Sequence, residues 1–301
     1  MYEMNLDISL ESNRTKTKIG REITSPAIAG VVILYHPGKD VYDNIMTYID
    51  SLNVLYVVDN SEHENEKVIT TIKSIPNIKY IKHAKNMGIA KSLNEVLNIV
   101  ANKYEWLLTM DQDTKFKKGT FRKYLLMLPC LPNNGKVYGF TPRYKGGDDL
   151  TVPYKISNWC ITSGNIINVS IALKCGGFDE NLFIDSVDEE FCLRCNKRGF
   201  LLYEYTKEIM IQKVGNPRTI KIGSLKICTT TNHNYIRLYY IMRNALYVSQ
   251  KYPETVKHYY SMIIRRIVKI ILFESDKIRK LHFIKKGFID FFQHKMGKLD
   301  V

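Results

Sequence analysis

The chain has 301 residues, of which 45% are hydrophobic and 25% are charged. This composition is typical of a folded globular protein and excludes an extensively disordered or fibrous one. The formal net charge of +14 predicts a surface that attracts phosphate-bearing partners such as nucleotides, nucleic acids or anionic membranes. No window offers the ~20 uninterrupted apolar residues of a membrane span, and the first residues lack the apolar core of a signal peptide. With six scattered cysteines, these features predict a cytoplasmic protein whose thiols are reduced.

Residues 1–26 are polar and mixed in charge, which predicts a tail ahead of the folded body. Four short apolar runs rich in β-branched residues follow and alternate with amphipathic stretches: 29–35, 54–59, 78–81 and 105–111. This alternation predicts βαβ units and a mostly parallel sheet covered by helices on both faces. The sequence therefore predicts a Rossmann-like α/β nucleotide-binding domain within residues 27–250.

The pattern changes after residue 113. A loop-rich stretch leads to a strand-like segment at 159–169 and a helix through 188–200, which together predict an acceptor-side lobe built onto the same sheet. From about Tyr235 apolar residues recur at helical spacing, and lysines and arginines fill the gaps. Residues 251–301 are predicted to form a basic, amphipathic helical extension that either packs on the domain or lies on an anionic membrane surface.

Carboxylates follow two of the predicted strands. Asp111 and Asp113 lie in a turn directly after a buried run, where alternate carboxylates can point toward one divalent ion that in turn binds a diphosphate. Asp59 ends another run, and its carboxylate can accept hydrogen bonds from a base or a ribose. A solvated turn and a helix N-cap are the plain alternatives. Because the carboxyl ends of parallel strands share one edge of a sheet, we predict a nucleotide and metal site there.

A later acid cluster opens the helix predicted from residue 188. A sugar hydroxyl attacks efficiently only when a base removes its proton. Asp188 is the candidate base, since the acids beside it, Glu189 and Glu190, would raise its pKa. An acidic helix start favoured by the helix dipole is the alternative that the sequence leaves open.

Phosphate-binding candidates lie at two further places in the chain. Asn86 is predicted to cap a helix that carries Lys91 one turn in, and a helix N-terminus with a nearby lysine suits phosphate. Late in the chain, His233, Arg237 and Arg243 are candidates to meet a diphosphate, and surface positions are the alternative.

These motifs occur in the order found in inverting family 2 glycosyltransferases of the GT-A fold, and the chain resembles the bacterial rhamnosyltransferase branch of that family. The resemblance covers roughly residues 27–247, and an ordered series of motifs is far more specific than any one of them. The matching segments are VVILYHP, VVDNS, NMGIAKSLN, LLTMDQD, ITSGN, GGFDENLFIDSVDEEFCLR and RLYYIMRN.

The resemblance implies a role for several residues. Asp59 would recognise the base, Asp111 and Asp113 would serve the ribose and the metal, and Asp188 would be the catalytic base of an inverting transfer. It also implies Mn²⁺ or Mg²⁺, a dTDP- or UDP-linked sugar donor, and a saccharide or lipid-linked saccharide acceptor in surface polysaccharide synthesis. The expected donor is dTDP-rhamnose, and another UDP- or dTDP-sugar is the alternative. The residues expected on the acceptor or diphosphate side are Glu190, Arg194, Arg237 and Arg243.

One departure from the family pattern concerns the metal. Similar proteins commonly carry a histidine where this chain has Gln212, which is a weaker metal ligand. Either His233 takes that place or the metal is held more loosely, and the sequence leaves both open.

Two other classes of protein share some of these features. Nucleotidyltransferases also combine paired aspartates with a Rossmann-like sheet, but they usually carry a glycine- and arginine-rich first loop, and this chain offers only Gly38 and Lys39 there. A nucleic-acid-binding protein would suit the charge, but no helix-turn-helix, RNP-like or zinc-finger spacing occurs. The sequence therefore favours sugar transfer without nucleic acid as a partner. It predicts a cytoplasmic enzyme in peripheral contact with the inner face of the plasma membrane.

Overall fold

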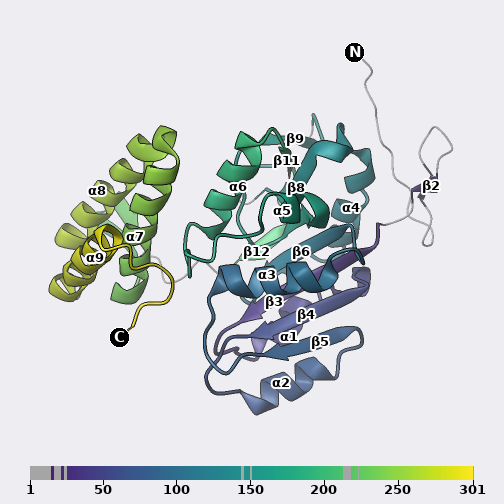
Figure 1. Cartoon of the computed structure of the whole chain (residues 1–301), viewed down its shortest axis with the longest axis horizontal. Coiled ribbons are helices and arrows are strands. Elements are labelled where there is room, and N and C mark those ends of the chain that lie inside the picture. The colour runs from purple at the N-terminus through teal and green to yellow at the C-terminus, as the bar shows by residue number, and fades with distance from the viewer. Residues whose placement is uncertain are drawn as a thin grey trace.

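The computed structural model describes residues 15–16, 22–23, 26–143, 146–149, 151–212, 218–222 and 224–300. The polar tail predicted for residues 1–26 lies largely outside these residues. The two short strands that are described there, β1 (Thr15–Lys16) and β2 (Glu22–Ile23), pair antiparallel with each other. The rest of the chain forms an α/β body with a group of helices beside it (Figure 1).

An eight-stranded sheet with the order β5-β4-β3-β6-β10-β8-β11-β9 forms the centre of the body. Its first half is parallel: β3 (Ile28–Leu34) lies between β4 (Val54–Asp59) and β6 (Trp106–Asp111), and β4 pairs with β5 (Ile78–Lys82). The three inner strands are almost continuously buried because helices cover both faces. The predicted parallel half is confirmed, and β3, β4 and β6 end at the same edge.

The second half of the sheet is mixed. β10 runs antiparallel to β6 and β8, β11 runs parallel to β8, and β9 forms the antiparallel edge. β7 and β12 pair beside the turn that follows β6, and β13 and β14 form a hairpin. Because β10 starts opposite Thr109, the segment before it lies against the acid turn. The bounds of these strands are β7 (Thr114–Phe116), β8 (Val137–Pro142), β9 (Tyr154–Ser157), β10 (Asn165–Asn168), β11 (Leu201–Tyr205), β12 (Met210–Gln212), β13 (Arg218–Ile222) and β14 (Leu225–Thr230).

Helices cover the sheet on both faces. One hydrophobic core lies under α1, α2 and α4, and a second lies under α3, α5 and α6. The sheet is therefore the middle of three layers, as its apolar strands require. The bounds of the helices are α1 (Asp40–Ile45), α2 (Glu66–Lys73), α3 (Ile89–Val100), α4 (Thr120–Leu125), α5 (Val169–Lys174) and α6 (Val187–Lys197), with 3₁₀ turns at Ile49–Ser51, Leu128–Cys130, Asn134–Lys136 and Pro253–Thr255.

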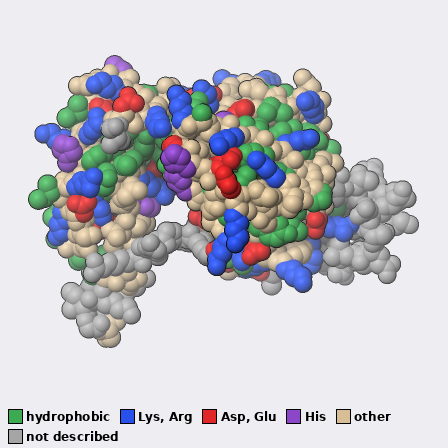
Figure 2. Space-filling view, turned by 90° about the horizontal axis from the view of Figure 1, so that it is seen from below, with side chains coloured by type: hydrophobic (Ala, Val, Ile, Leu, Met, Phe, Trp, Pro, Cys, Tyr) green, Lys and Arg blue, Asp and Glu red, His purple; other side chains and the backbone are tan. Residues whose placement is uncertain are grey.

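Three helices follow the body: α7 (Tyr235–Lys251), α8 (Val256–Phe273) and α9 (Lys277–Phe292). They stand together to one side of the body in Figure 1, so the helical extension begins at α7, and the boundary predicted at residue 250 falls at the end of that helix. α9 packs closely on α7 at Gly287, where an added Cβ would lie 2.5 Å from a carbonyl oxygen of α7. Figure 2 shows hydrophobic and basic side chains next to one another on the surface of this helical unit.

Candidate active site

Asp59 ends β4 and is completely buried. One of its carboxylate oxygens accepts the backbone N–H of Ser61 (2.9 Å), and the other accepts the hydroxyl of Tyr80 (2.9 Å). Burial and the two acids beside it, Glu64 and Asp59, raise the pKa of Tyr80, so this hydroxyl stays protonated. These two bonds use two of the about four acceptor positions of a carboxylate, and they hold Asp59 rigidly at the end of the strand.

Gln112 lies between Asp111 and Asp113 and fixes the turn that they form. Its side-chain oxygen accepts the backbone N–H of Tyr35 (2.9 Å), and its side-chain nitrogen donates to the carbonyl of the same residue (3.0 Å). Asn44 on α1 donates to the backbone carbonyl of Gln112 (2.8 Å). The middle residue of the motif thus ties the end of β6 to the end of β3. Sequence reasoning gave Gln112 no role, although an amide suits one backbone donor and one backbone acceptor.

The acids of the motif and of the later cluster meet at this edge of the sheet. Burial, Asp113 and Asp188 raise the pKa of Asp111 to about 7, while Arg237 opposes the rise. Burial and Glu189 raise the pKa of Asp188 to about 6. Carboxylates from the end of β6 and the start of α6, 77 residues apart in the sequence, therefore share one electrostatic environment.

The segment before β10 holds both acids in place. The backbone N–H of Thr162 donates to Asp188 Oδ2 (3.1 Å), and that of Glu189 donates to Asp188 Oδ1 (3.0 Å). The hydroxyl of Ser163 accepts the backbone N–H of Asp111 (3.1 Å). The ITSGN segment, which the sequence marked only as part of a resemblance, is therefore the link between the acid pair and the candidate base.

The acid pair has the right chemistry for a divalent cation. Carboxylate oxygens are the hard ligands that Mn²⁺ and Mg²⁺ prefer, and the mutual repulsion of Asp111, Asp113 and Asp188 is what a bound cation would relieve. In the part of the chain that the structure describes, no three histidine, cysteine or acidic side chains form a ready-made metal site.

The positions expected to complete the metal site lie on two different segments. Gln212 pairs with Thr114 across β12 and β7, so it lies next to Asp113, as the resemblance implies. His233 lies beside Arg237 and Arg266, and burial and these two charges lower its pKa to about 4. Substitution of His233 for the usual histidine stays a prediction.

The predicted cap at Asn86 is wrong by two residues. α3 starts after Gly88, and the side chain of Asn86 accepts the backbone N–H of that glycine (2.9 Å). Gly88 has a φ of +83°, and an added Cβ would lie 2.7 Å from the carbonyl oxygen of Phe183, so the chain can turn here only with glycine. Lys91 is exposed on the first turn of α3, as predicted.

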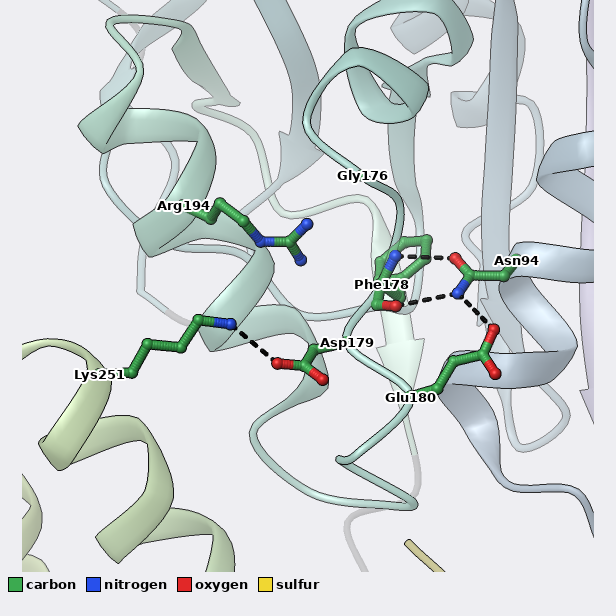
Figure 3. A pocket seen from close by; sticks show the side chains of 7 residues that line it. All are labelled: Asn94, Gly176, Phe178, Asp179, Glu180, Arg194 and Lys251. Atoms are coloured by element: carbon green, nitrogen blue, oxygen red, sulfur yellow. Dashed lines mark hydrogen bonds and ion pairs between the residues drawn. The ribbon is translucent and has the colours of Figure 1, made fainter. Parts of the chain in front are cut away.

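The structure corrects the roles expected for Glu190 and Arg194. Glu190 is completely buried, and its carboxylate is bound by Arg194 (2.6 Å), Lys251 (2.7 Å) and the hydroxyl of Tyr252 (2.8 Å). Figure 3 shows the cavity of about 340 Å³ beside this network, where Lys251 also reaches Asp179 (2.8 Å). Because their charges are already paired, Glu190 and Arg194 serve to anchor the end of α7 to α6.

Arg243 is corrected as well, whereas the role expected for Arg237 stays a prediction. Arg243 is completely buried between α7 and the C-terminal residues, with the rings of Tyr239 and Tyr240 each 5.2 Å from its guanidinium. It cannot meet a diphosphate there. Arg237 is half exposed, pairs with Asp185 (2.9 Å) and lies near enough to Asp111 and Asp113 for both acids to raise its pKa.

A mostly parallel sheet whose edge carries a D-x-D acid pair, with a third carboxylate on the helix beyond, is the arrangement of a GT-A glycosyltransferase. Comparison with known proteins agrees with this class. Residues 39–181 match the model of glycosyl transferase family 2, and the dTDP-rhamnosyl transferase RfbF of Shigella flexneri is 25% identical over 282 residues, which cover 86% of this chain and 92% of that protein. Residues 39–181 therefore carry a glycosyl transferase family 2 domain.

Solved structures of low sequence identity share the fold. The mannosyltransferase PcManGT from Pyrobaculum calidifontis, in complex with GDP-Man and Mn²⁺, superposes with a TM-score of 0.51 at 11% identity over 91% of this chain and 76% of its own. GalNAc-T7 with UDP, GalNAc and Mn²⁺ gives a TM-score of 0.51 at 12% identity, over 60% of this chain and 42% of its own length. The chain therefore spans less than half of GalNAc-T7. The family match and the similarity to the rhamnosyl transferase favour sugar transfer over nucleotidyl transfer or nucleic-acid binding.

Proposed function

We propose that this glycosyltransferase is metal dependent and inverting, and that it transfers rhamnose from dTDP-rhamnose to a saccharide or lipid-linked saccharide acceptor in surface polysaccharide synthesis. The meeting of Asp111, Asp113 and Asp188 at one edge of the sheet carries the chemistry of this proposal. The similarity to the S. flexneri dTDP-rhamnosyl transferase over most of both chains supports the sugar and the nucleotide. Another UDP- or dTDP-sugar is the alternative donor, because uracil and thymine present the same imide N–H to an acceptor such as Asp59.

Asp188 is the proposed catalytic base. Its pKa of about 6 leaves it ionised at neutral pH and still basic enough to take a proton. It would remove the proton of the acceptor hydroxyl while that oxygen attacks the anomeric carbon, as the bond from this carbon to the leaving diphosphate oxygen breaks. A single displacement of this kind inverts the anomeric carbon. The N–H groups of Thr162 and Glu189 fix the carboxylate in one orientation for the transfer.

Asp111 and Asp113 would hold the divalent cation, with Gln212 next to them and His233 as a further candidate ligand. When bound, the cation would neutralise the negative charge that develops on the leaving diphosphate. The protein itself supplies Arg237, a half-exposed guanidinium whose charge already interacts with both aspartates. Asp59, Asn86 and Lys91 would bind the nucleotide at the ends of β4 and the start of α3.

We propose that the helical unit binds an anionic bilayer through its outward surface. In the described part of the chain no helix is long and apolar enough to cross a membrane. The outward side of α8 nevertheless exposes large apolar side chains about one turn apart, and α9 exposes a second group. They are Val256, Tyr260, Ile264, Val268, Ile271 and Leu272 on α8, and Ile278, Phe288, Ile289 and Phe292 on α9.

The charges on the two helices favour a bilayer over a second copy of the chain. α8 contains no acidic residue, and the single acid of α9, Asp290, is buried and paired with Lys286 (3.0 Å). Lysines and arginines such as Lys257, Arg265 and Lys285 are exposed among the apolar side chains. A symmetric dimer through this face would bring like charges together, whereas an anionic lipid surface is complementary to it.

The proposed chemistry is tested by separating binding from transfer. Asp188→Asn should bind dTDP and Mn²⁺ like the wild type in calorimetry, and should lose at least about 100-fold in sugar transfer because the proton acceptor is gone. Asp113→Ala should instead weaken metal-dependent dTDP binding, because a metal ligand is lost. Transfer would be followed with labelled dTDP-rhamnose and a saccharide acceptor extracted from membranes. Wild-type transfer by Asp188→Asn would remove Asp188 from the proposed role.

A further inference from the structure

The end of β14 and the loop that joins it to α7 are held by cationic side chains from the C-terminal helices. Arg266 donates to the hydroxyl of Thr231 in this loop (3.2 Å), Lys269 to a backbone carbonyl oxygen at the end of β14 (3.0 Å), and Lys280 to an asparagine side chain of the loop (2.7 Å). The loop leads directly into the first turn of α7, which carries Arg237. The C-terminal helices thus place positive charge next to the sheet edge that carries Asp111 and Asp113.

Arg266 on α8 is attracted by the charges of Asp185 and Glu274, but both of these acids form ion pairs with other residues. Asp185 is already paired with Arg237 (2.9 Å), and Glu274 with Lys280 (2.7 Å). Arg266 has no carboxylate partner in the described part of the chain, and its buried Nε has no hydrogen-bond partner there. A guanidinium has five N–H groups, and burying a charge without a partner is costly. Arg266 is therefore poised to bind an anion.

Arg266 and Arg237 belong to one region of the structure. Arg266 donates to Thr231 in the loop that leads to Arg237, and the charges of both arginines act on His233 in that loop. The positive charge of Arg237 also opposes that of Arg266. Two like charges held close together in a half-buried place are stabilised when an anion binds between them. A guanidinium suits phosphate because two of its N–H groups can donate to two phosphate oxygens.

We propose that Arg266 and Arg237 form a phosphate-binding site that takes a diphosphate group at the junction of the catalytic domain and the helical unit. The identity of that group rests on the proposed function, since a diphosphate belongs either to the nucleotide-sugar donor or to a lipid-linked acceptor. Both sources are compatible with a site whose second arginine interacts with Asp111 and Asp113. In this arrangement α8 contributes Arg266 to the substrate site from its inner side.

The neighbouring arginine provides a matched control. Arg265 is exposed, and its Nε donates only to a carbonyl oxygen of its own helix (3.2 Å). Arg265→Gln and Arg266→Gln remove the same charge from adjacent positions. In calorimetric titrations of the full chain with inorganic pyrophosphate and a chelator, we expect Arg266→Gln to bind about 10-fold more weakly, as loss of a charge-assisted phosphate contact predicts. Arg265→Gln should bind like the wild type.

Two further titrations distinguish the sources of the diphosphate. If it belongs to the donor, Arg266→Gln should weaken binding of dTDP with Mn²⁺, and dTDP should displace pyrophosphate from the wild type. If it belongs to the acceptor, dTDP binding should be unchanged, and pyrophosphate should still bind the dTDP-loaded wild type but bind the loaded variant weakly. Either pattern supports the site.

Wild-type pyrophosphate affinity in Arg266→Gln, with an unchanged unfolding temperature, would overturn the proposal. If that variant is less stable, Arg266→Lys decides, because lysine keeps the charge and loses the paired geometry. Weaker binding by this variant supports the site, and wild-type affinity refutes it. All of these experiments measure binding and not sugar transfer. They therefore test the phosphate site even if the proposed catalytic roles are wrong.

Discussion

Replacing Asp111 by asparagine should stabilise the metal-free protein at pH 8. The carboxylate of Asp111 accepts no hydrogen bond from the described residues, so the nearly isosteric amide has no such bond to lose. Burial and the neighbouring acids raise its pKa from 3.8 to about 7. Each pKa unit corresponds to about 1.36 kcal/mol, which sets an upper limit of about 4 kcal/mol on the cost of ionising this group.

The raised pKa of Asp111 makes the stability of the wild type depend on pH. The folded state holds the proton of Asp111 more tightly than the unfolded state, so the wild type loses stability as pH rises from about 4 to about 7. Partial contact with water screens the charge of Asp111. We therefore expect Asp111→Asn to raise the free energy of unfolding by about 1–2 kcal/mol, or the unfolding temperature by roughly 2–6 °C. The gain should shrink as pH is lowered and vanish near pH 4.

Thermal unfolding with a chelator at several pH values measures this difference directly. Asp50→Asn is the matched control, because Asp50 is exposed just before β4, at the opposite edge of the sheet. Addition of Mn²⁺ should stabilise the wild type, since a ligand of the folded state raises its melting temperature, and should have much less effect on Asp111→Asn. If Asp111→Asn is no more stable than the wild type at pH 8, Asp111 is not held in a repulsive acid site.

Two further predictions concern the catalytic base and the membrane. The kcat/KM of transfer should fall as pH drops below about 6, because Asp188 must be ionised to accept a proton; a profile that stays flat to pH 5 would contradict this. Replacing Ile264 and Leu272 together by serine should weaken binding to anionic vesicles by at least about 10-fold, because burial of two apolar side chains is lost. Serine at the exposed Met46, directly after α1, is the control, and equal vesicle binding by both variants would refute the proposed surface.

The vesicle experiment requires the full chain for a structural reason. The hydroxyl of Tyr259 on α8 donates to Glu189 (2.5 Å), the neighbour of the proposed base, and Tyr252 donates to the buried Glu190 (2.8 Å). A chain ending near Lys251 would leave both acids without these donors. Point changes on the outward face of α8 avoid this problem, because they leave the contacts with α6 intact.

Local patterns determined much of the fold and part of the site. The apolar runs that became β3, β4 and β6 are buried on both faces, so their composition alone predicts parallel strands. The placement of Asp59 and Asp111 follows, because polar residues that end parallel strands meet at one edge. The charge and spacing of the C-terminal residues likewise predicted amphipathic helices.

Tertiary structure decided which charged residues are available to a ligand. Glu190 and Arg243 are residue types that often bind ligands, but both are completely buried and bonded to other segments, Glu190 to Tyr252 and Arg243 to the carbonyl of Lys295, and spacing along the chain cannot reveal such partners. The bracing by Gln112 and the contact between Thr162 and Asp188 also join segments far apart in sequence. The sequence by itself determined where the acid edge lies, because that depends on strand periodicity. Only the folded structure decided which charges around it remain unpaired, because pairing depends on which distant segments pack together.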